Sequence, residues 1–230
     1  MGLNYLVIMN DVETELDKGG LLIGAREVPV TQQGMRDSVK FARHVLANVE
    51  NVGQVLSSDS ARVSRILHYL RLEFKHPLRV RETDVLRERD FGVLNGTSIK
   101  LLRGFQSDLF QHTRICAENG ESVSQCAARV VPFIKEAVSS RDDNIVMLSH
   151  PMACNITFNS LLGRKLTDIY PFWLKKGSYV VLSRGDDLSP WFGFETAFNV
   201  IEDKEYSVDE IQDEFDTINN LSSPSQETNS

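Results

Sequence analysis

The amino-acid sequence predicts an α/β fold: a three-layer sandwich with a mainly parallel central sheet and helices on both faces. Short apolar segments alternate with amphipathic ones along most of the chain, which is typical of this class. The two clearest strand candidates, Leu3–Met9 and Asn144–Leu148, are almost continuously apolar, as expected of strands covered on both faces. In such folds ligands bind at the carboxyl ends of the strands. We therefore look for chemistry in the residues that begin at Asn10 and Ser149.

The remaining elements follow in order along the chain. Apolar residues at helical spacing predict a helix over Met35–Asn48, and Ser58-Asp59-Ser60 is an N-cap signal for a second helix, Ala61–Phe74. Gly163 is a good C-cap for a helix over Met152–Leu162. The other predicted helices are 97–113 and Val123–Val138, and the other predicted strands are Gln54–Ser57, Arg79–Glu82, Gly177–Ser183 and Thr196–Ile201.

Composition and charge restrict the class of protein. The 230 residues are 41% hydrophobic and 25% charged, which suits a globular protein with one domain. The net charge is −7, from 25 basic and 32 acidic residues. Eight acidic residues and one lysine lie within 202–216, so the rest of the chain is nearly neutral. We expect no nucleic-acid partner, because no large basic surface is apparent.

The charge distribution also suggests how the chain is divided. We predict a domain over 1–201, an acidic segment over 202–218 and a flexible tail over 219–230, which has too few apolar residues to pack. Val208, Ile211 and Phe215 recur at helical spacing in the acidic segment. Two alternatives stay open for it: a solvated charged helix, or an amphipathic helix that docks on this domain or on a partner.

Cysteine usage and hydropathy predict a cytoplasmic protein without a metal. Cys116, Cys126 and Cys154 are odd in number and lack paired spacing, which argues against a disulfide framework and against a structural zinc site. Residues 144–163 contain no charged side chain but are too polar for a membrane span. We expect no cofactor and no membrane association.

Six segments together resemble one family. They are VIMNDVET (7–14), VPVTQQG (28–34), LSSDSARVSRIL (56–67), LRERDFGVLNG (86–96), NGESVSQCAAR (119–129) and VMLSHP (146–151). Their order and spacing resemble the histidine phosphatase superfamily, which has the phosphoglycerate-mutase-like fold. The family motifs are Arg-His-Gly-Glu-Thr, Pro-Leu-Thr-x-x-Gly, Ser-Ser-Asp-Leu-x-Arg, a Glu-containing loop that ends in Gly, Gly-Glu-Ser and Ser-His-Gly. The resemblance covers roughly residues 3–201.

The resemblance implies a phosphohistidine mechanism without a metal. The first-motif histidine attacks phosphorus, two arginines and a second histidine bind the phosphoryl oxygens, and a glutamate protonates the leaving oxygen. Such fixed positive groups stabilise the negative charge of the transition state. In this sequence Arg62 matches the second arginine, Glu88 the proton donor and His150 the second histidine. Arg89 is a weaker candidate for substrate binding.

The first motif, however, departs from the family. Asn10 stands in place of the arginine, Asp11 in place of the nucleophilic histidine and Val12 in place of the glycine, while Asp17 replaces a phosphate-contacting asparagine and Pro151 the last glycine. The site is therefore less positive by two or three charges. Two anions about 4 Å apart repel by roughly 1 kcal/mol in water and about 4 kcal/mol at an effective dielectric of 20. We expect phosphate or a phosphorylated small molecule to bind only weakly.

Two functional hypotheses follow from these departures. The first is a catalytically impaired pseudophosphatase with a binding or regulatory role, acting through a protein partner or as a homodimer. In this hypothesis Asp11 and Asn10 pair with Arg62 or His150 in an inactive pocket. The alternative is an active, metal-independent phosphomonoesterase in which Asp11 is a substitute nucleophile, with Glu88 and His150 as its other catalytic residues.

Overall fold

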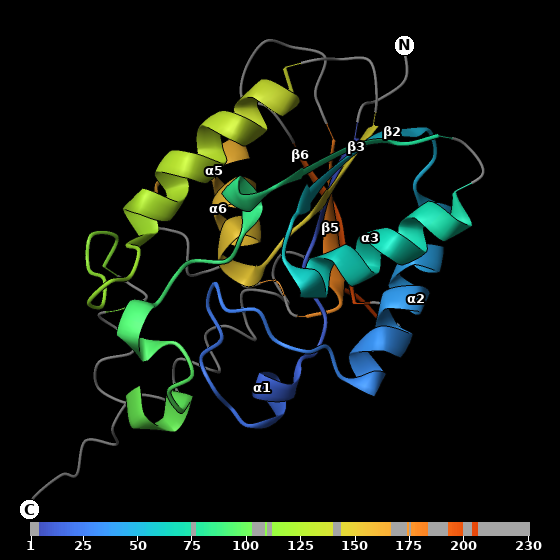
Figure 1. Cartoon of the computed structure of the whole chain (residues 1–230). Coiled ribbons are helices and arrows are strands. Elements are labelled where there is room, and N and C mark those ends of the chain that lie inside the picture. The colour runs from blue at the N-terminus through green and yellow to red at the C-terminus, as the bar shows by residue number, and fades with distance from the viewer. Residues whose placement is uncertain are drawn as a thin grey trace, which may run out of the picture.

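A seven-stranded sheet forms the centre of the computed structural model (Figure 1). The structure describes residues 5–74, 77–102, 109, 112–139, 144–166, 174, 176–183, 193–199 and 204–206. The strands of this described part are β1 (Tyr5–Met9), β2 (Val52–Ser58), β3 (Arg79–Thr83), β4 (Asn144–Leu148), β5 (Ser178–Ser183), β6 (Gly193–Asn199) and β7 (Lys204–Tyr206). Their order in the sheet is β3-β2-β4-β1-β5-β6-β7.

The sheet has a parallel half and an antiparallel half. β3, β2, β4 and β1 pair in parallel. β5 is antiparallel to β1, β6 to β5 and β7 to β6, so five of these seven strands point the same way. The predicted α/β class with a mainly parallel sheet is confirmed. β7 belongs to the segment predicted to be an acidic appendage, and pairs with β6; the predicted acidic helix and tail lie outside the described residues.

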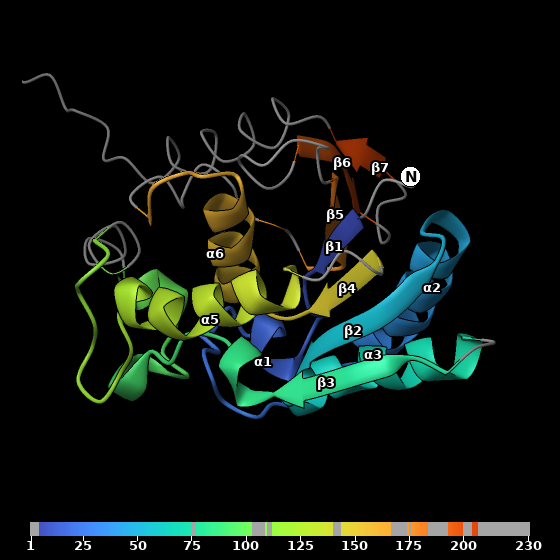
Figure 2. The ribbon, with the colours of Figure 1, turned by 90° about the horizontal axis from the view of Figure 1, so that it is seen from above.

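Helices cover both faces of the sheet (Figure 2). They are α1 (Glu15–Lys18), α2 (Gln32–Asn48), α3 (Ala61–Glu73), α5 (Val123–Ala137) and α6 (Pro151–Leu161), with 3₁₀ turns at Asp84–Leu86, Gly92–Leu94 and Ile99–Leu102. α2 and α3 lie on one face, and α5 and α6 on the other. No helix within the described ranges is long and apolar enough to cross a membrane.

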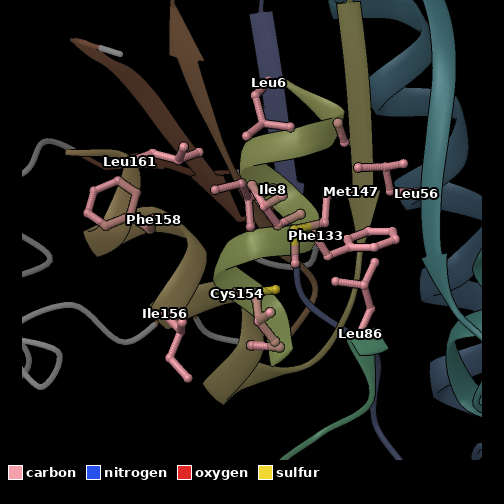
Figure 3. Close-up of a cluster of buried hydrophobic side chains, with 14 of the residues drawn as sticks. Leu6, Ile8, Leu56, Leu86, Phe133, Met147, Cys154, Ile156, Phe158 and Leu161 are labelled. Carbon is pink, nitrogen blue, oxygen red and sulfur yellow. The ribbon is translucent and has the colours of Figure 1, made fainter. Parts of the chain in front are cut away.

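The alternation of side chains along each strand divides the core into two clusters. In β1, Leu6 and Ile8 face α5 and α6, where they pack with Met147, Phe133 and other apolar residues (Figure 3). Val7 and Met9 face α2 and α3 on the opposite side. Every residue of β4 is buried, which is why that strand is apolar without alternation. The continuous apolar segments of the sequence therefore correspond to central strands.

Most predicted boundaries differ from the observed ones by one or two residues. α2 begins at Gln32, three residues before the predicted start, because the Thr31 hydroxyl accepts a hydrogen bond from the Gly34 amide and caps the helix. Of the predicted helix over 97–113, the described residues show a 3₁₀ turn at Ile99–Leu102 and one α-helical residue, Leu109, whereas His112 and Thr113 are not helical.

A close backbone approach fixes the loop after β1. A side chain on Gly34 would collide with the carbonyl oxygen of Glu13, so only glycine fits at this position. The Thr31 hydroxyl also donates to the Glu13 carboxylate at 2.7 Å, and the Thr31 amide donates to the Glu13 carbonyl. The start of α2 therefore holds in place the loop that contains Asp11.

Candidate functional site

Three neighbouring strand ends bring the candidate residues together. Asn10 and Asp11 follow β1, Ser58 ends β2, and His150 follows β4. Since β2, β4 and β1 are adjacent and parallel, their carboxyl ends meet at one edge of the sheet. Arg62, in the first turn of α3, reaches the same place. The predicted convergence of Asp11, Arg62 and His150 is present in the structure.

The Asp11 carboxylate lies at the centre of this site. Its Oδ2 accepts a hydrogen bond from Arg62 Nε at 2.7 Å and lies 2.9 Å from His150 Nδ1. Its Oδ1 lies 3.1 Å from the ammonium group of Lys176. All but Lys176 are almost completely buried. Asp11 therefore contacts both groups that the sequence assigned to phosphate, Arg62 and His150, and the ammonium group of Lys176 in addition.

Lys176 is a site residue that the sequence reasoning missed. Its Nζ also lies 2.8 Å from Asp17 Oδ2 and 3.3 Å from the Val12 carbonyl oxygen. Lys176 precedes β5, and because β5 is antiparallel to β1, the amino end of β5 lies at the site edge. Recognising Gly177–Ser183 as an antiparallel neighbour of β1 is the signal that would have found it.

The Asn10 side chain bonds to backbone groups of two segments, its own loop and the segment before β5. Its Nδ2 donates to the Leu174 carbonyl at 2.6 Å, and its Oδ1 accepts from the Asp11 amide at 2.8 Å. The side chain is buried. Asn10, predicted to bind substrate, thus shapes the loop that presents Asp11, with both ends of its amide already hydrogen-bonded.

The rest of the Arg62 guanidinium is held by a loop. Nη1 donates to the Arg26 carbonyl at 2.7 Å and Nη2 to the Gly24 carbonyl at 2.9 Å. Gly24 has a positive φ of 58°, and a side chain there would collide with Asn95 Oδ1. With its third nitrogen bound to Asp11, the guanidinium has an internal acceptor on each nitrogen. Its orientation is fixed without a ligand.

Glu88 lies next to this cluster and caps α6. Its carboxylate accepts from the Arg89 amide at 2.7 Å and from the Met152 amide at 3.2 Å. Burial raises the pKa of Glu88, although these backbone hydrogen bonds and the charge of Arg62 oppose the shift. Arg129 fixes the surrounding loop, because its Nη2 donates to the Glu88 carbonyl and its guanidinium pairs with Glu121 at 2.7 Å.

Arg89, the weaker candidate for substrate binding, lies beside the site with its guanidinium bound to backbone carbonyls. Its guanidinium is buried and donates to three backbone carbonyls: Glu121 at 2.6 Å, Leu109 at 2.8 Å and Ile115 at 2.9 Å. The sequence shows the charge of Arg89 but not the loop carbonyls around it. Arg89 joins three chain segments beside the site.

The charges of the cluster balance one another. Burial alone would raise the pKa of Asp11, but Lys176, His150 and Arg62 together hold it well below its usual range. Burial disfavours the Lys176 ammonium group, yet the charges of Asp11 and Asp17 outweigh this and raise its pKa. Burial and the charge of Arg62 lower the pKa of His150 to about 4, so its ring is neutral at pH 7. The carboxylates of Asp11 and Asp17 thus neutralise the charges of Arg62 and Lys176.

No grouping suited to a metal ion occurs within the part of the chain that the structure describes. The described residues therefore offer the site side-chain cations only.

The motifs, their order and this arrangement at the sheet edge define the class of protein. The chain belongs to the histidine phosphatase superfamily (branch 1), whose sequence model matches residues 12–189. The match begins immediately after Asn10 and Asp11, the two positions that depart most from the family motif.

Particular relatives are phosphatases and mutases. A 2,3-bisphosphoglycerate-dependent phosphoglycerate mutase of Rhizobium etli is 28% identical over 64% of this chain and 75% of its own. The structure is similar to that of mycobacterial glucosyl-3-phosphoglycerate phosphatase, with a TM-score of 0.73, 21% identity and coverage of 84% and 98% of the two chains. That protein has also been solved with VO3 and with inorganic phosphate. The α-ribazole phosphatase of Shigella flexneri gives a TM-score of 0.71 at 20% identity, over 83% and 94%.

Proposed function

We propose that this chain is a histidine phosphatase superfamily member without phosphatase activity, which keeps the fold for a binding or regulatory role. The observation that supports this is the position of the Asp11 carboxylate, which bridges Arg62, His150 and Lys176. In the family that the sequence resembles, the groups at the positions of Arg62 and His150 bind the phosphoryl oxygens. Here an internal carboxylate is already bound to them, and a dianionic phosphate would have to displace it.

Electrostatics favour the internal carboxylate. Asp11 is tethered to the chain, so its pairing with Arg62 costs little entropy on binding, whereas free phosphate loses translational and rotational freedom. The cluster has no net positive charge left, since Asp17 balances Lys176. Phosphorylated small molecules are therefore proposed to bind weakly, and the role of the protein to depend on a protein partner or on self-association.

The alternative is that Asp11 itself attacks phosphorus, since it stands where the family has its nucleophile. Three positive or hydrogen-bonding groups hold its oxygens, and the charged pair with Arg62 is buried. These contacts stabilise the carboxylate and lower its nucleophilicity. Oδ1 contacts the Lys176 ammonium group at 3.1 Å and is completely buried, so a substrate would have to enter a closed site to meet it.

Release of phosphate from an aryl phosphate, with a chelator present, tests this proposal. Wild type is expected to show no turnover above the Asp11→Asn variant, which has the same shape but no carboxylate charge. Vanadate affinity by calorimetry is expected to be weaker than about 1 mM, a free energy of about −4 kcal/mol. Turnover that depends on Asp11 and survives chelation would favour the alternative and overturn the proposal.

A further inference from the structure

Two serine hydroxyls contact Nε2 of His150, the ring nitrogen that is turned away from Asp11. His150 Nε2 lies 3.0 Å from Ser60 Oγ and 3.0 Å from Ser58 Oγ. His150 Nδ1 lies 2.9 Å from Asp11 Oδ2 on the other side of the ring. A continuous chain of contacts therefore runs from the carboxylate through the imidazole to a serine hydroxyl.

The contacts also determine which ring nitrogen has the proton. Nδ1 lies 2.9 Å from Asp11 Oδ2 and 3.1 Å from Arg62 Nε, whose one N–H also reaches Asp11 Oδ2 at the shorter distance of 2.7 Å. We assign the ring proton to Nδ1, which then donates to the carboxylate oxygen, because two facing lone pairs at 2.9 Å would repel. The ring is neutral at pH 7, since burial and Arg62 lower the pKa of His150. Nε2 is then an unprotonated acceptor for a serine O–H. This is the tautomer in which a histidine serves as general base for serine and a carboxylate holds it in orientation.

We propose that Ser60, His150 and Asp11 form a nucleophilic triad that accepts the acyl group of small, uncharged carboxylic esters. Ser60 Oγ attacks the carbonyl carbon while its proton moves to His150 Nε2. His150 returns that proton to the departing alcohol oxygen as the carbon–oxygen bond of the ester breaks. Water then attacks the acyl-serine and gives its proton to His150 Nε2. His150 returns that proton to Ser60 Oγ as the carboxylic acid leaves. This goes beyond the proposed loss of phosphatase activity and does not depend on it.

Ser60 rather than Ser58 has the surroundings of a nucleophile. Ser60 is the N-cap residue of α3, but its hydroxyl makes no capping hydrogen bond and is available to His150. Ser122 at the start of α5 shows the ordinary arrangement, in which the hydroxyl accepts from the Gln125 amide. Both serines are buried, Ser58 completely and Ser60 with 3% of its surface exposed, and the Ser58 oxygen accepts a hydrogen bond from the Ser60 amide. In the family motif Ser-Ser-Asp-Leu-x-Arg, Ser60 stands in place of leucine.

The backbone amide of the next residue, Ala61, is a donor for the oxyanion of the reaction. The Ala61 N–H, in the first turn of α3, donates at 2.9 Å to the carboxylate of Glu27. Glu27 is about half exposed, so an oxyanion from the surface already binds beside Ser60. A substrate oxyanion can replace that carboxylate at the same donor, where the helix dipole favours negative charge.

Labelling by phenylmethylsulfonyl fluoride, followed by intact mass and peptide mapping, tests the proposal. Wild type is expected to take up one sulfonyl group at Ser60 and to hydrolyse p-nitrophenyl acetate. Ser60→Ala is expected to do neither. Asp11→Asn removes the charge that holds the imidazole and is expected to slow labelling by about 10²–10⁴-fold, the usual range for general-base catalysis.

Matched controls separate a triad from a merely buried network. Ser122→Ala, at the N-cap of α5 and away from His150, is expected to label at Ser60 as wild type does, and Ser58 of the wild type is expected to remain unlabelled. Glu27→Gln removes the negative charge that competes for the Ala61 amide and is expected to raise the labelling rate several-fold. Because Glu27 lies near the surface, this variant tests the site even if circular dichroism shows that Asp11→Asn is unfolded. No label on wild type, or a label on Ser58, would overturn the proposal.

Discussion

The Arg62 guanidinium and the Asp11 carboxylate form a buried ion pair, 2.7 Å from Nε to Oδ2, and neither side chain is more than 2% exposed. A buried pair of this kind contributes little net stability compared with a well-packed apolar pair, because both ions lose hydration. Removal of one partner, however, leaves an uncompensated charge in the interior. Substitution of Asp11 therefore leaves Arg62 available to bind an anion from solution.

Asp11→Ser is expected to create an anion site. Loss of the carboxylate leaves Arg62, Lys176 and His150 facing a small hydroxyl, which should destabilise the fold by about 3–5 kcal/mol. Phosphate or sulfate can then fill the vacated position and restore stability, by about 2.7 kcal/mol at 100 times its Kd. Thermal unfolding at increasing phosphate concentration measures this. Asp37→Ser, another buried carboxylate, is the control and should show no phosphate dependence; equal responses would show that Asp11 does not occupy an oxyanion position.

Stability is expected to fall as the pH is lowered from 7 to 4. His150 has a folded pKa of about 4, below its ordinary 6.5, so the unfolded chain binds more protons between these values and stability rises with pH there. The shift corresponds to about 3 kcal/mol. The depressed pKa of Asp11 adds a further loss below about pH 4.

Urea unfolding of wild type and His150→Gln at pH 7 and pH 5 tests this dependence. The variant should lose most of the pH response between these two values, whereas His68→Gln, an exposed histidine of α3, should keep it. An unchanged pH response in His150→Gln would contradict the burial of a neutral ring.

Lys176→Met is expected to destabilise the protein by about 2–4 kcal/mol. The methionine preserves most of the apolar stem but removes the charge that pairs with Asp11 and Asp17, leaving two carboxylates close together. Lys18→Met, an exposed lysine at the end of α1, is the matched control and should change stability by less than 0.5 kcal/mol. Equal effects of the two substitutions in chemical denaturation would refute the role assigned to Lys176.

Arg89→Lys is expected to cost about 2–4 kcal/mol although the charge is retained. A lysine ammonium group cannot reach the three carbonyls of Glu121, Leu109 and Ile115 in the way that a planar guanidinium does. Arg36→Lys, on the exposed side of α2, should be nearly neutral. If Arg89→Lys instead left stability intact and altered vanadate affinity, the original prediction of a binding role would be correct.

The part of the site that the sequence predicts is the part formed by parallel strands. Asp11 and His150 follow apolar strands, and Arg62 follows a helix-cap signal, so their convergence follows from topology alone. Lys176 could not be found in this way, because it precedes its strand and only the antiparallel direction of β5 places it at the same edge. No local pattern in the sequence specifies that direction.

Arg89 and the stretch after Gly96 show a second limit. The sequence predicts a continuous helix there, but its first described residues form a 3₁₀ turn, and Leu102 of that turn packs with Leu22, Phe91 and Leu109 in a small separate cluster. The spacing of apolar residues shows only that one side of a segment is apolar. Which loops surround that side, and which carbonyls they turn toward Arg89, depends on tertiary contacts that periodicity does not contain.

The antiparallel docking of β5 also has a consequence for folding. Asp11 meets Arg62, His150 and Lys176, which lie 51, 139 and about 165 residues away along the chain. Loop-closure entropy makes such distant encounters late events, and the ions remain hydrated until β4 and β5 have joined β1. A chain arrested before that stage would have Lys176 still in water. The reactivity of the Lys176 amine toward an acylating reagent during refolding therefore reports the moment at which the sheet becomes complete.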